Sequence, residues 1–310
     1  MKATRDTFGH TLAELANENE ELIAVNADLG KATRLSYFQK KHPERFIEVG
    51  IAECNMIGIA SGLAEHGYRV FLASFASFLT GKYDVIRVSL GYSAAPVVLV
   101  GTHAGLAIGK DGVTQMGLED IALMRAIPGM TVLQPATPLE AEQVTAYLAN
   151  EPLSGPAYLR LGRQPTEDVL ASDYKFEFGK GAVLREGTDV TLISTGCILP
   201  EVLKAADHLE GAGVSCRVVN MTTIKPIDND IIIDSAQKTK HLVTIEDHSV
   251  IGGLGAAVAD VLVTHCPRSL LKIGLNDCFP ESGPPDQLWH KYGLSAPKMA
   301  ESISNFIATK

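Results

Sequence analysis

The glycine-rich segment "THAGLAIGKDGVTQMGLED", residues 102–120, carries two side chains that could act on a bound molecule. His103 offers an imidazole and Asp111 a carboxylate, and the neighbouring glycines allow a ligand to approach the backbone closely. Long segments without regular structure inside compact domains are usually functional, which favours a binding loop here. Each residue also has a simpler interpretation, because His103 can be a hydrogen-bonded histidine at a strand end and Asp111 a turn-forming residue.

A second candidate group is the carboxylate of Glu53 in "GIAECNMIGIASGLAEHG", residues 50–67. Glu53 begins an expected helix whose following residues are mostly small, so a ligand or a neighbouring backbone can come close and the acid could face a site. Alternatively, the carboxylate only interacts with the positive end of the helix dipole. These residues alone leave both interpretations open.

Two phenylalanines and two arginines complete the set of candidates. Phe75 and Phe78 stand three positions apart at the start of a helix, so both rings face the same way and either sandwich a flat heterocycle or pack in the core. Arg5 opens the first expected helix, and Arg163 follows the last expected strand of the first domain. Either guanidinium could bind a phosphate through paired hydrogen bonds, although exposed arginines usually bind nothing so specific.

The pattern of apolar residues predicts the elements that hold these side chains. Short β-branched runs beginning at residues 22, 45, 68, 96, 130 and 157 alternate with helical patterns, which is typical of a parallel sheet with helices on both faces. Ligands bind at the carboxyl ends of strands in such sheets. The loops after residues 27, 49, 74, 101 and 161 should therefore share one rim. On or just past these loops lie Asp28, Glu53, Phe75, Phe78, His103, Asp111 and Arg163.

A second set of elements follows a polar segment. Residues 162–187 are polar, are interrupted by proline and glycine and have no helical period, which predicts a linker at 166–187. Strand-like runs begin again at 189, 214, 241 and 270, with helices expected near 198–211, 229–239 and 253–264. We therefore expect an α/β protein of two doubly wound domains with mostly parallel sheets, at residues 1–165 and 188–310. The glycines of "IGGLGAAVAD", residues 251–260, lack the third glycine and the acid of a dinucleotide fingerprint, so no NAD site is predicted.

Composition excludes several classes of function. The chain has 310 residues, of which 46% are hydrophobic and 20% charged, and a formal charge of −9 without a basic patch, so a soluble protein that binds no nucleic acid is expected. No apolar run resembles a signal peptide or a membrane span, which favours the cytoplasm. The five cysteines show no C-x-x-C pair and are interpreted as buried thiols rather than as disulfides or zinc ligands.

Eight segments in order resemble the carboxyl-terminal half of transketolases, the thiamine diphosphate-dependent ketol-transfer enzymes. The resemblance runs nearly end to end and is carried by "ATR" at 3–5, "NADL" at 26–29, "HPERFIEVGIAECNM" at 42–56, "ASFASF" at 73–78, "THAGLAIGKDGVTQMGLED" at 102–120, "LGRQP" at 161–165, "TIKPID" at 223–228 and "TIEDH" at 244–248. It implies the thiamine diphosphate pyrimidine-binding fold followed by the transketolase C-terminal domain.

The resemblance implies roles for four residues toward the cofactor. Glu53 matches the glutamate that hydrogen-bonds N1′ of the aminopyrimidine and so promotes loss of the proton at C2, a role that requires a buried acid with a raised pKa. Phe75 and Phe78 match the aromatic residues that hold the aminopyrimidine ring. Asp28 matches an acid at the cofactor-binding subunit interface.

Five residues match family positions that face the substrate. His103, Asp111 and Gln115 would bind the hydroxyls or phosphate of a sugar, with His103 and Glu53 as the catalytic residues. Gln115 stands where many members have histidine and can hydrogen-bond but not shuttle a proton. Arg5 and Arg163 match two arginines that grip phosphate.

Two differences from the family pattern affect the expected activity. Ala32 stands where many members have a serine that binds the substrate phosphate, and Lys31 or Arg34 could compensate. The "G-D-G" motif that binds the cofactor's diphosphate and Mg²⁺ is missing, so the Mg²⁺ ligands are expected on a partner chain. The resemblance thus implies one subunit of a two-chain transketolase, acting on sugar phosphates in a heterotetramer with an amino-terminal, diphosphate-binding subunit.

Two alternatives remain open at this point. One is a subunit of a related thiamine diphosphate enzyme, of the 1-deoxyxylulose-5-phosphate synthase or 2-oxo acid dehydrogenase beta type, although the "GKDGVTQM" loop favours transketolase over the latter. The other is a non-catalytic binding or regulatory homologue. Glu246 and His248 in "TIEDH" are interpreted as structural or interface residues.

Overall fold

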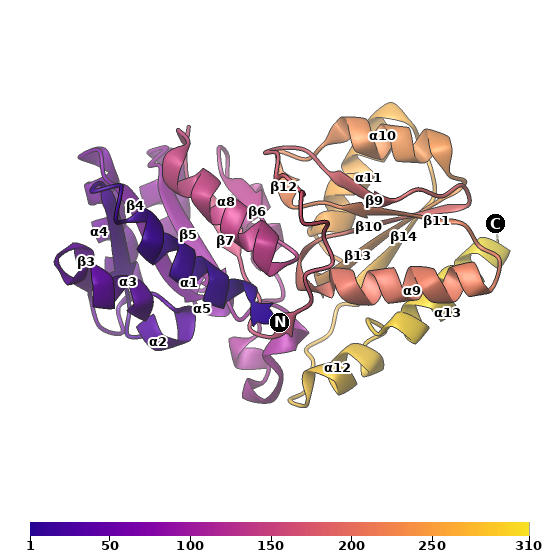
Figure 1. Cartoon of the computed structure of the whole chain (residues 1–310), viewed down its shortest axis with the longest axis horizontal. Coiled ribbons are helices and arrows are strands. Elements are labelled where there is room, and N and C mark those ends of the chain that lie inside the picture. Colours follow the sequence, from indigo (N-terminus) through magenta and orange to yellow (C-terminus); the bar gives the residue numbers. More distant parts are fainter. Residues whose placement is uncertain (310) are drawn as a thin grey trace.

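The computed structural model describes residues 1–309, which form two α/β domains side by side. In Figure 1 the first domain runs from indigo to magenta and the second from orange to yellow. The amino terminus lies near the junction of the domains, and the carboxyl terminus lies at the far side of the second.

The first domain is built on a seven-stranded sheet in the order β12-β6-β7-β5-β4-β2-β3. The six strands predicted from the sequence are all present and parallel: β2 (Leu22–Asn26), β3 (Phe46–Glu48), β4 (Arg69–Phe75), β5 (Val97–Thr102), β6 (Thr131–Leu133) and β7 (Ala157–Arg160). The seventh, β12 (Thr223–Lys225), comes from later in the chain and pairs antiparallel with β6.

Helices cover both faces of this sheet because successive strand residues point to opposite sides. Leu22 and Ala24 of β2 pack with the helices α1 (Thr4–Leu15), α3 (Ser36–Lys41) and α8 (Pro138–Asn150). Ile23 and Val25 of the same strand belong to the other cluster, with α4 (Glu53–Glu65), α6 (Tyr83–Ile86), η2 (Arg87–Tyr92) and α7 (Asp120–Ala126). Short helices at the ends of strands complete the domain: α2 (Gly30–Thr33), η1 (Pro43–Arg45), α5 (Ala76–Thr80), η3 (Leu106–Asp111) and η4 (Val113–Gln115).

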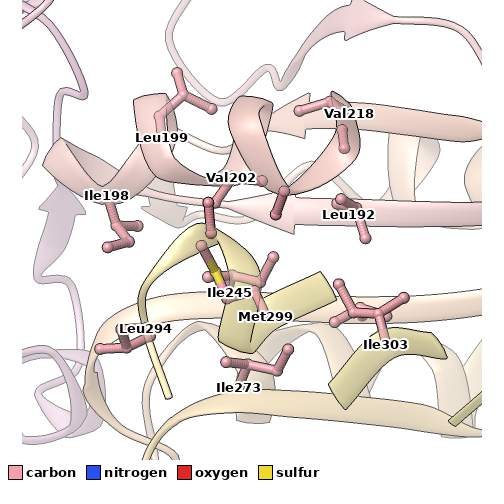
Figure 2. Close-up of a cluster of buried hydrophobic side chains, with 14 of the residues drawn as sticks. Leu192, Ile198, Leu199, Val202, Val218, Ile245, Ile273, Leu294, Met299 and Ile303 are labelled. Atoms are coloured by element: carbon pink, nitrogen blue, oxygen red, sulfur yellow. The ribbon is translucent and has the colours of Figure 1, made fainter. Parts of the chain in front are cut away.

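The second domain has a five-stranded sheet in the order β14-β13-β10-β11-β9. The four predicted strands β10 (Val190–Ser194), β11 (Cys216–Asn220), β13 (His241–Ser249) and β14 (Leu270–Leu275) are present and parallel. On one face η5 (Gly196–Ile198), α9 (Leu199–Gly211), α12 (Pro285–Lys291) and α13 (Ala296–Ala308) pack on the strands, and Figure 2 shows Leu192, Val202, Ile245, Met299 and Ile303 pointing toward one another there. The helices α10 (Asn229–Lys238) and α11 (Leu254–His265) cover the other face. All three helices expected in this domain are therefore found.

The segment predicted as a linker is only partly a linker. Within residues 166–187, β9 (Ala182–Arg185) pairs antiparallel with β11 and forms the edge of the second sheet. Near the start of the segment, β8 (Pro165–Thr166) pairs with β1 (Lys2–Ala3). The local pattern did not reveal β9, because a short edge strand with half-buried residues lacks the strong apolar signal of an inner strand.

The expectation of buried thiols is wrong for most of the cysteines. Only Cys216, on an inner strand, is buried, whereas Cys54 and Cys278 are exposed and Cys197 and Cys266 are partly exposed. Cys54 lies on the outer face of α4, away from the sheet that the helix covers. Among residues 1–309, no helix combines the length and apolar character needed to cross a bilayer.

Candidate active site

The predicted rim is present at the carboxyl ends of the neighbouring strands β3, β2, β4, β5 and β7. Because these strands are parallel, the residues that follow them lie along one edge of the sheet. Asp28 follows β2, Glu53 opens α4 after β3, Phe75 ends β4, His103 follows β5 and Arg163 follows β7. The rim gathers residues that are up to about half the chain apart in sequence.

Hydrogen bonds define the tautomer of His103. The Thr102 hydroxyl donates to the Ser74 carbonyl oxygen at 3.2 Å and lies 2.9 Å from Nδ1 of His103. Since the single hydroxyl proton is already used, Nδ1 must carry the proton and donate to Thr102. Nε2 of His103 then accepts a hydrogen bond from Nη1 of Arg5 at 2.7 Å. His103 is therefore oriented at both ring nitrogens.

The surroundings of His103 also keep its imidazole neutral. Its side chain is buried with 3% exposure, and desolvation, followed by the positive charges of Arg5, Arg163 and Arg34, lowers its pKa to about 3. A histidine with this pKa is not an imidazolium at neutral pH, so it has no extra proton to give to a substrate as a general acid. His103 can bind as a neutral imidazole, and its backbone holds the uncommon left-handed conformation with φ of 59°.

The two candidate aromatic rings contact each other. The centroids of Phe75 and Phe78 are 5.2 Å apart at an interplanar angle of 23°, which is the spacing of rings in direct contact. A flat heterocycle therefore does not fit between them, and the idea of a sandwich is wrong for this arrangement. The ring centroids of Phe75 and His103 are 3.9 Å apart. Only an outer face of the pair, on the partly exposed Phe78 side, is open to another ring.

Glu53 lies in the first turn of α4, and its carboxylate has no partner among the described residues. Within residues 1–309 no hydrogen bond or ion pair engages this carboxylate. Its side chain is only half-buried, so the full burial expected for it is not met within this chain. Because α4 begins on the rim, a molecule bound at this edge of the sheet would contact Glu53.

The glycine-rich loop holds Asp111 against Arg163. Nη1 of Arg163 lies 2.7 Å from Oδ2 of Asp111 and donates to the Ile108 carbonyl oxygen at 3.1 Å. Both side chains are more than one-third exposed, so solvent screens this pair. Gln115 ends the short helix η4 and is half-buried. The structure thus pairs Asp111 of the loop with Arg163, which follows β7.

Asp28 borders a cleft of about 520 Å³ beside β2. The cleft is lined partly by Lys31, Ala32 and Lys40. Asp28 adopts a left-handed conformation with φ of 58°, and its amide donates to Oε1 of Glu48 at 2.8 Å. Arg34, offered from the sequence as a replacement for the missing serine, is instead paired with Asp6.

Sequence reasoning missed Glu48, which organises this part of the rim. It accepts hydrogen bonds from the Asn26 side chain, the Asp28 amide and the Gly50 amide. Desolvation raises the pKa of Glu48, but these hydrogen bonds outweigh it and hold the pKa below its usual value. The sequence did contain one signal for Glu48, because this acid stands directly at the end of a predicted strand. Thr102, which orients His103, and Asp247 of β13 left no such signal, because their bonds to Ser74 and Leu106 span 28 and 141 positions of the chain.

The family description "Transketolase, pyrimidine binding domain" matches residues 1–168, and "Transketolase, C-terminal domain" matches residues 179–299. The chain belongs to the transketolase family. The two matches agree with the division into two sheets, except that β12 of the first sheet lies within the second match. This family depends on thiamine diphosphate.

The chain matches nearly the full length of proteins named as sections or subunits of transketolases. The chain is 43% identical to a Methanocaldococcus jannaschii protein provisionally named a transketolase C-terminal section, over 97% of this chain and 95% of that protein. It is 40% identical to the 6-deoxy-6-sulfo-D-fructose transketolase subunit SqwH of Clostridium sp. (strain MSTE9), over 96% and 92% of the two chains. A structure described as "Split gene transketolase, inactive beta4 tetramer" superimposes with a TM-score of 0.92 at 41% identity, over 99% of both chains.

Undivided transketolases are about twice as long. The chain is 35% identical to human transketolase, in an alignment that includes 98% of this chain but only 49% of the human protein. It therefore corresponds to the carboxyl-terminal section of a split transketolase. Within residues 1–309 no group of three or more histidine, cysteine or acidic side chains is arranged to hold a metal ion.

Proposed function

We propose that the chain is the carboxyl-terminal subunit of a two-chain transketolase, which transfers a two-carbon ketol unit from a ketose phosphate to an aldose phosphate. The observation that carries this proposal is the unpaired carboxylate of Glu53 on the same rim as a neutral, doubly oriented His103. An acid without a partner and a buried imidazole aimed by Arg5 form the kind of cluster found at catalytic sites.

Thiamine diphosphate fits the residues present on this rim. Glu53 would hydrogen-bond the aminopyrimidine, and the open face of the Phe75 and Phe78 pair would contact its ring. When bound, the cofactor supplies an acidic carbon that, once deprotonated, can attack a carbonyl and accept the electrons of a broken carbon–carbon bond. Burial of the half-exposed Glu53 would then be completed by the partner chain and the cofactor together.

The substrate would lie between the glycine-rich loop and the arginines. Nη1 of Arg5 lies 2.7 Å from Nε2 of His103 and also donates to the Ala32 carbonyl oxygen, whereas no hydrogen bond among residues 1–309 uses Nη2, so this guanidinium retains a donor for an anion. Arg163 would grip the same anion if it released Asp111. Asp111 and Gln115 would then bind sugar hydroxyls, and His103 would accept a hydrogen bond from a hydroxyl through Nε2 once Arg5 released this nitrogen and turned its Nη1 to the anion.

A partner chain would provide the remaining half of the site. This amino-terminal subunit would bind the cofactor's diphosphate and hold Mg²⁺, and two copies of each chain would form a heterotetramer in the cytoplasm. The support for this arrangement is that the chain spans about half of an undivided transketolase but nearly all of the carboxyl-terminal sections.

The test is isolation of the tagged chain from its own cells, followed by native mass spectrometry and donor assays of the complex. We expect a second chain in equal ratio and thiamine diphosphate-dependent activity with xylulose 5-phosphate rather than pyruvate. Glu53→Gln in that complex should lower kcat on the order of a hundredfold or more. Glu65→Gln, at the exposed end of the same helix, is the matched control. A complex in which Glu53→Gln keeps most of its activity would refute the assignment.

A sulfonate-terminated ketose is a second candidate donor. The observation that favours it is Ala32, which offers no hydroxyl beside the arginines, and the relative SqwH is named for a 6-deoxy-6-sulfo-D-fructose substrate. Comparing kcat/KM for the sulfonate and the phosphate donor in the same complex decides between the two.

A further inference from the structure

The loop of residues 103–120 belongs as much to the second domain as to the first. Its apolar side chains Leu106, Ile108, Met116 and Leu118 are buried in the cluster that forms the core of the second domain. The helix α12 contacts η3 of the loop, and Figure 1 shows α12 reaching to the side of the first domain. The segment that carries the candidate substrate-binding residues is thus built into the core of the other domain.

Asp247 of β13 joins this loop to two other segments. Its Oδ1 accepts a hydrogen bond from the Leu106 amide at 2.8 Å, and its Oδ2 accepts one from Nε1 of Trp289 at 3.1 Å. Its carbonyl oxygen accepts from Nη2 of Arg160 at 3.0 Å. The residue is 7% exposed, so these contacts are formed away from water.

The same strand also holds the far end of the loop. The Gly105 amide donates to the Gly117 carbonyl oxygen at 2.8 Å and closes the neck of the loop. The Ser249 amide donates to the Leu118 carbonyl oxygen at 2.8 Å. A Cβ atom on Gly105 would lie 2.4 Å from Oδ2 of Asp247, so this close approach requires glycine. Both ends of the loop are therefore fixed against β13.

We propose that Asp247 is a positioning residue, which holds the 103–120 loop in the conformation that binds substrate. The inference rests on the proposed function for the identity of what the loop binds. Within residues 1–309, the hydrogen bonds of Asp247 join it to the Leu106 amide, the Trp289 indole and the Arg160 guanidinium, and none joins it to a candidate substrate-binding side chain. Because Asp247 lies on β13, the second domain would thereby determine the conformation of the substrate-binding loop.

The decisive variant is Asp247→Asn in the full chain. The amide has one acceptor oxygen, and its NH₂ group would face a donor, so one of the two side-chain hydrogen bonds is lost. Trp289 is the only tryptophan, which makes its fluorescence a direct report on this contact. We expect a shifted emission and hydrogen exchange about tenfold faster in peptides of residues 104–118, with β2 and β4 unchanged. Asp286→Asn, an exposed position on the same helix as Trp289, is the control.

Activity with the partner chain supplies the second measurement. Asp247→Asn should raise KM for the anionic donor about tenfold while the affinity for thiamine diphosphate stays the same. Unchanged loop exchange, or an equal loss of cofactor affinity, would overturn the proposal. If Asp247→Asn does not fold, Trp289→Phe removes the indole donor and keeps the charge, and it should still accelerate exchange in the loop. If the wild-type complex transfers no ketol unit, the proposed function fails while the exchange data still decide the role of Asp247 in holding the loop.

Discussion

Arg5 donates from Nη1 to Nε2 of His103 across 2.7 Å, although 98 positions separate the two residues in sequence. The bond joins the first helix to the loop after β5 and fixes which nitrogen of the imidazole is free of a proton. It also places a guanidinium next to a buried ring that already resists protonation. The neutral state of His103 is therefore a consequence of burial and of the neighbouring positive charges, of which that of Arg5 contributes most.

Removing the guanidinium of Arg5 should raise the pKa of His103. Arg5→Ala deletes the largest charge contribution, but burial remains and keeps the pKa below the ordinary 6.5. The imidazole resonances of His103, assigned with a His103→Gln variant, report the titration by NMR. Arg163→Ala should raise the pKa less, because the Arg163 charge contributes less than that of Arg5. An equal effect of the two variants would contradict this ranking.

The stability of the chain should depend on pH through His103. The folded state keeps His103 neutral down to about pH 3, whereas the unfolded chain binds this proton near the ordinary pKa of 6.5. Between these values the unfolded state holds more protons, so the free energy of unfolding falls as pH falls. Chemical denaturation of the wild type and of His103→Gln from pH 7 to pH 4 measures this. The variant should lose less stability over that range.

Gly105→Ala should destabilise the chain more than Gly129→Ala. Both glycines have positive φ, 76° and 73°, so an alanine at either position carries the cost of a backbone dihedral that L-residues disfavour. Only at Gly105 does the new Cβ meet atoms, at 2.4 Å from Asp247, whereas nothing lies within 4 Å at Gly129. We expect an additional loss of about 1–3 kcal/mol at Gly105, measured by urea denaturation. Equal losses would show that Asp247 moves away from the new Cβ without a cost in stability.

Ala32→Ser should improve use of a phosphate donor. A hydroxyl on this residue would enter the cleft beside Lys31 and add a hydrogen-bond donor for a doubly charged phosphate. In the assembled complex we expect KM for the phosphate donor to fall roughly three- to tenfold with little change in kcat. Ala32→Val adds bulk without a hydroxyl and should not improve KM.

The local sequence determined the strands and helices and the order in which they alternate. Runs such as residues 22–25 and 97–100 are apolar at every position, and a short run of this kind is typical of a strand covered on both faces. Parallel strands bring their carboxyl ends to one edge, so the rim that gathers Glu53, His103 and Arg163 also followed from the sequence.

Only the tertiary structure decided the state of the side chains on that rim. The charge of His103 depends on Arg5 and on burial, and the position of the glycine-rich loop depends on Asp247, which is 141 positions from Leu106. The direct contact between Phe75 and Phe78, the partial exposure of Glu53 and the placement of β9 and β12 are likewise set by segments distant in the chain. Local periodicity reports which face of an element is apolar, but it contains no information about which distant group will lie within hydrogen-bond distance.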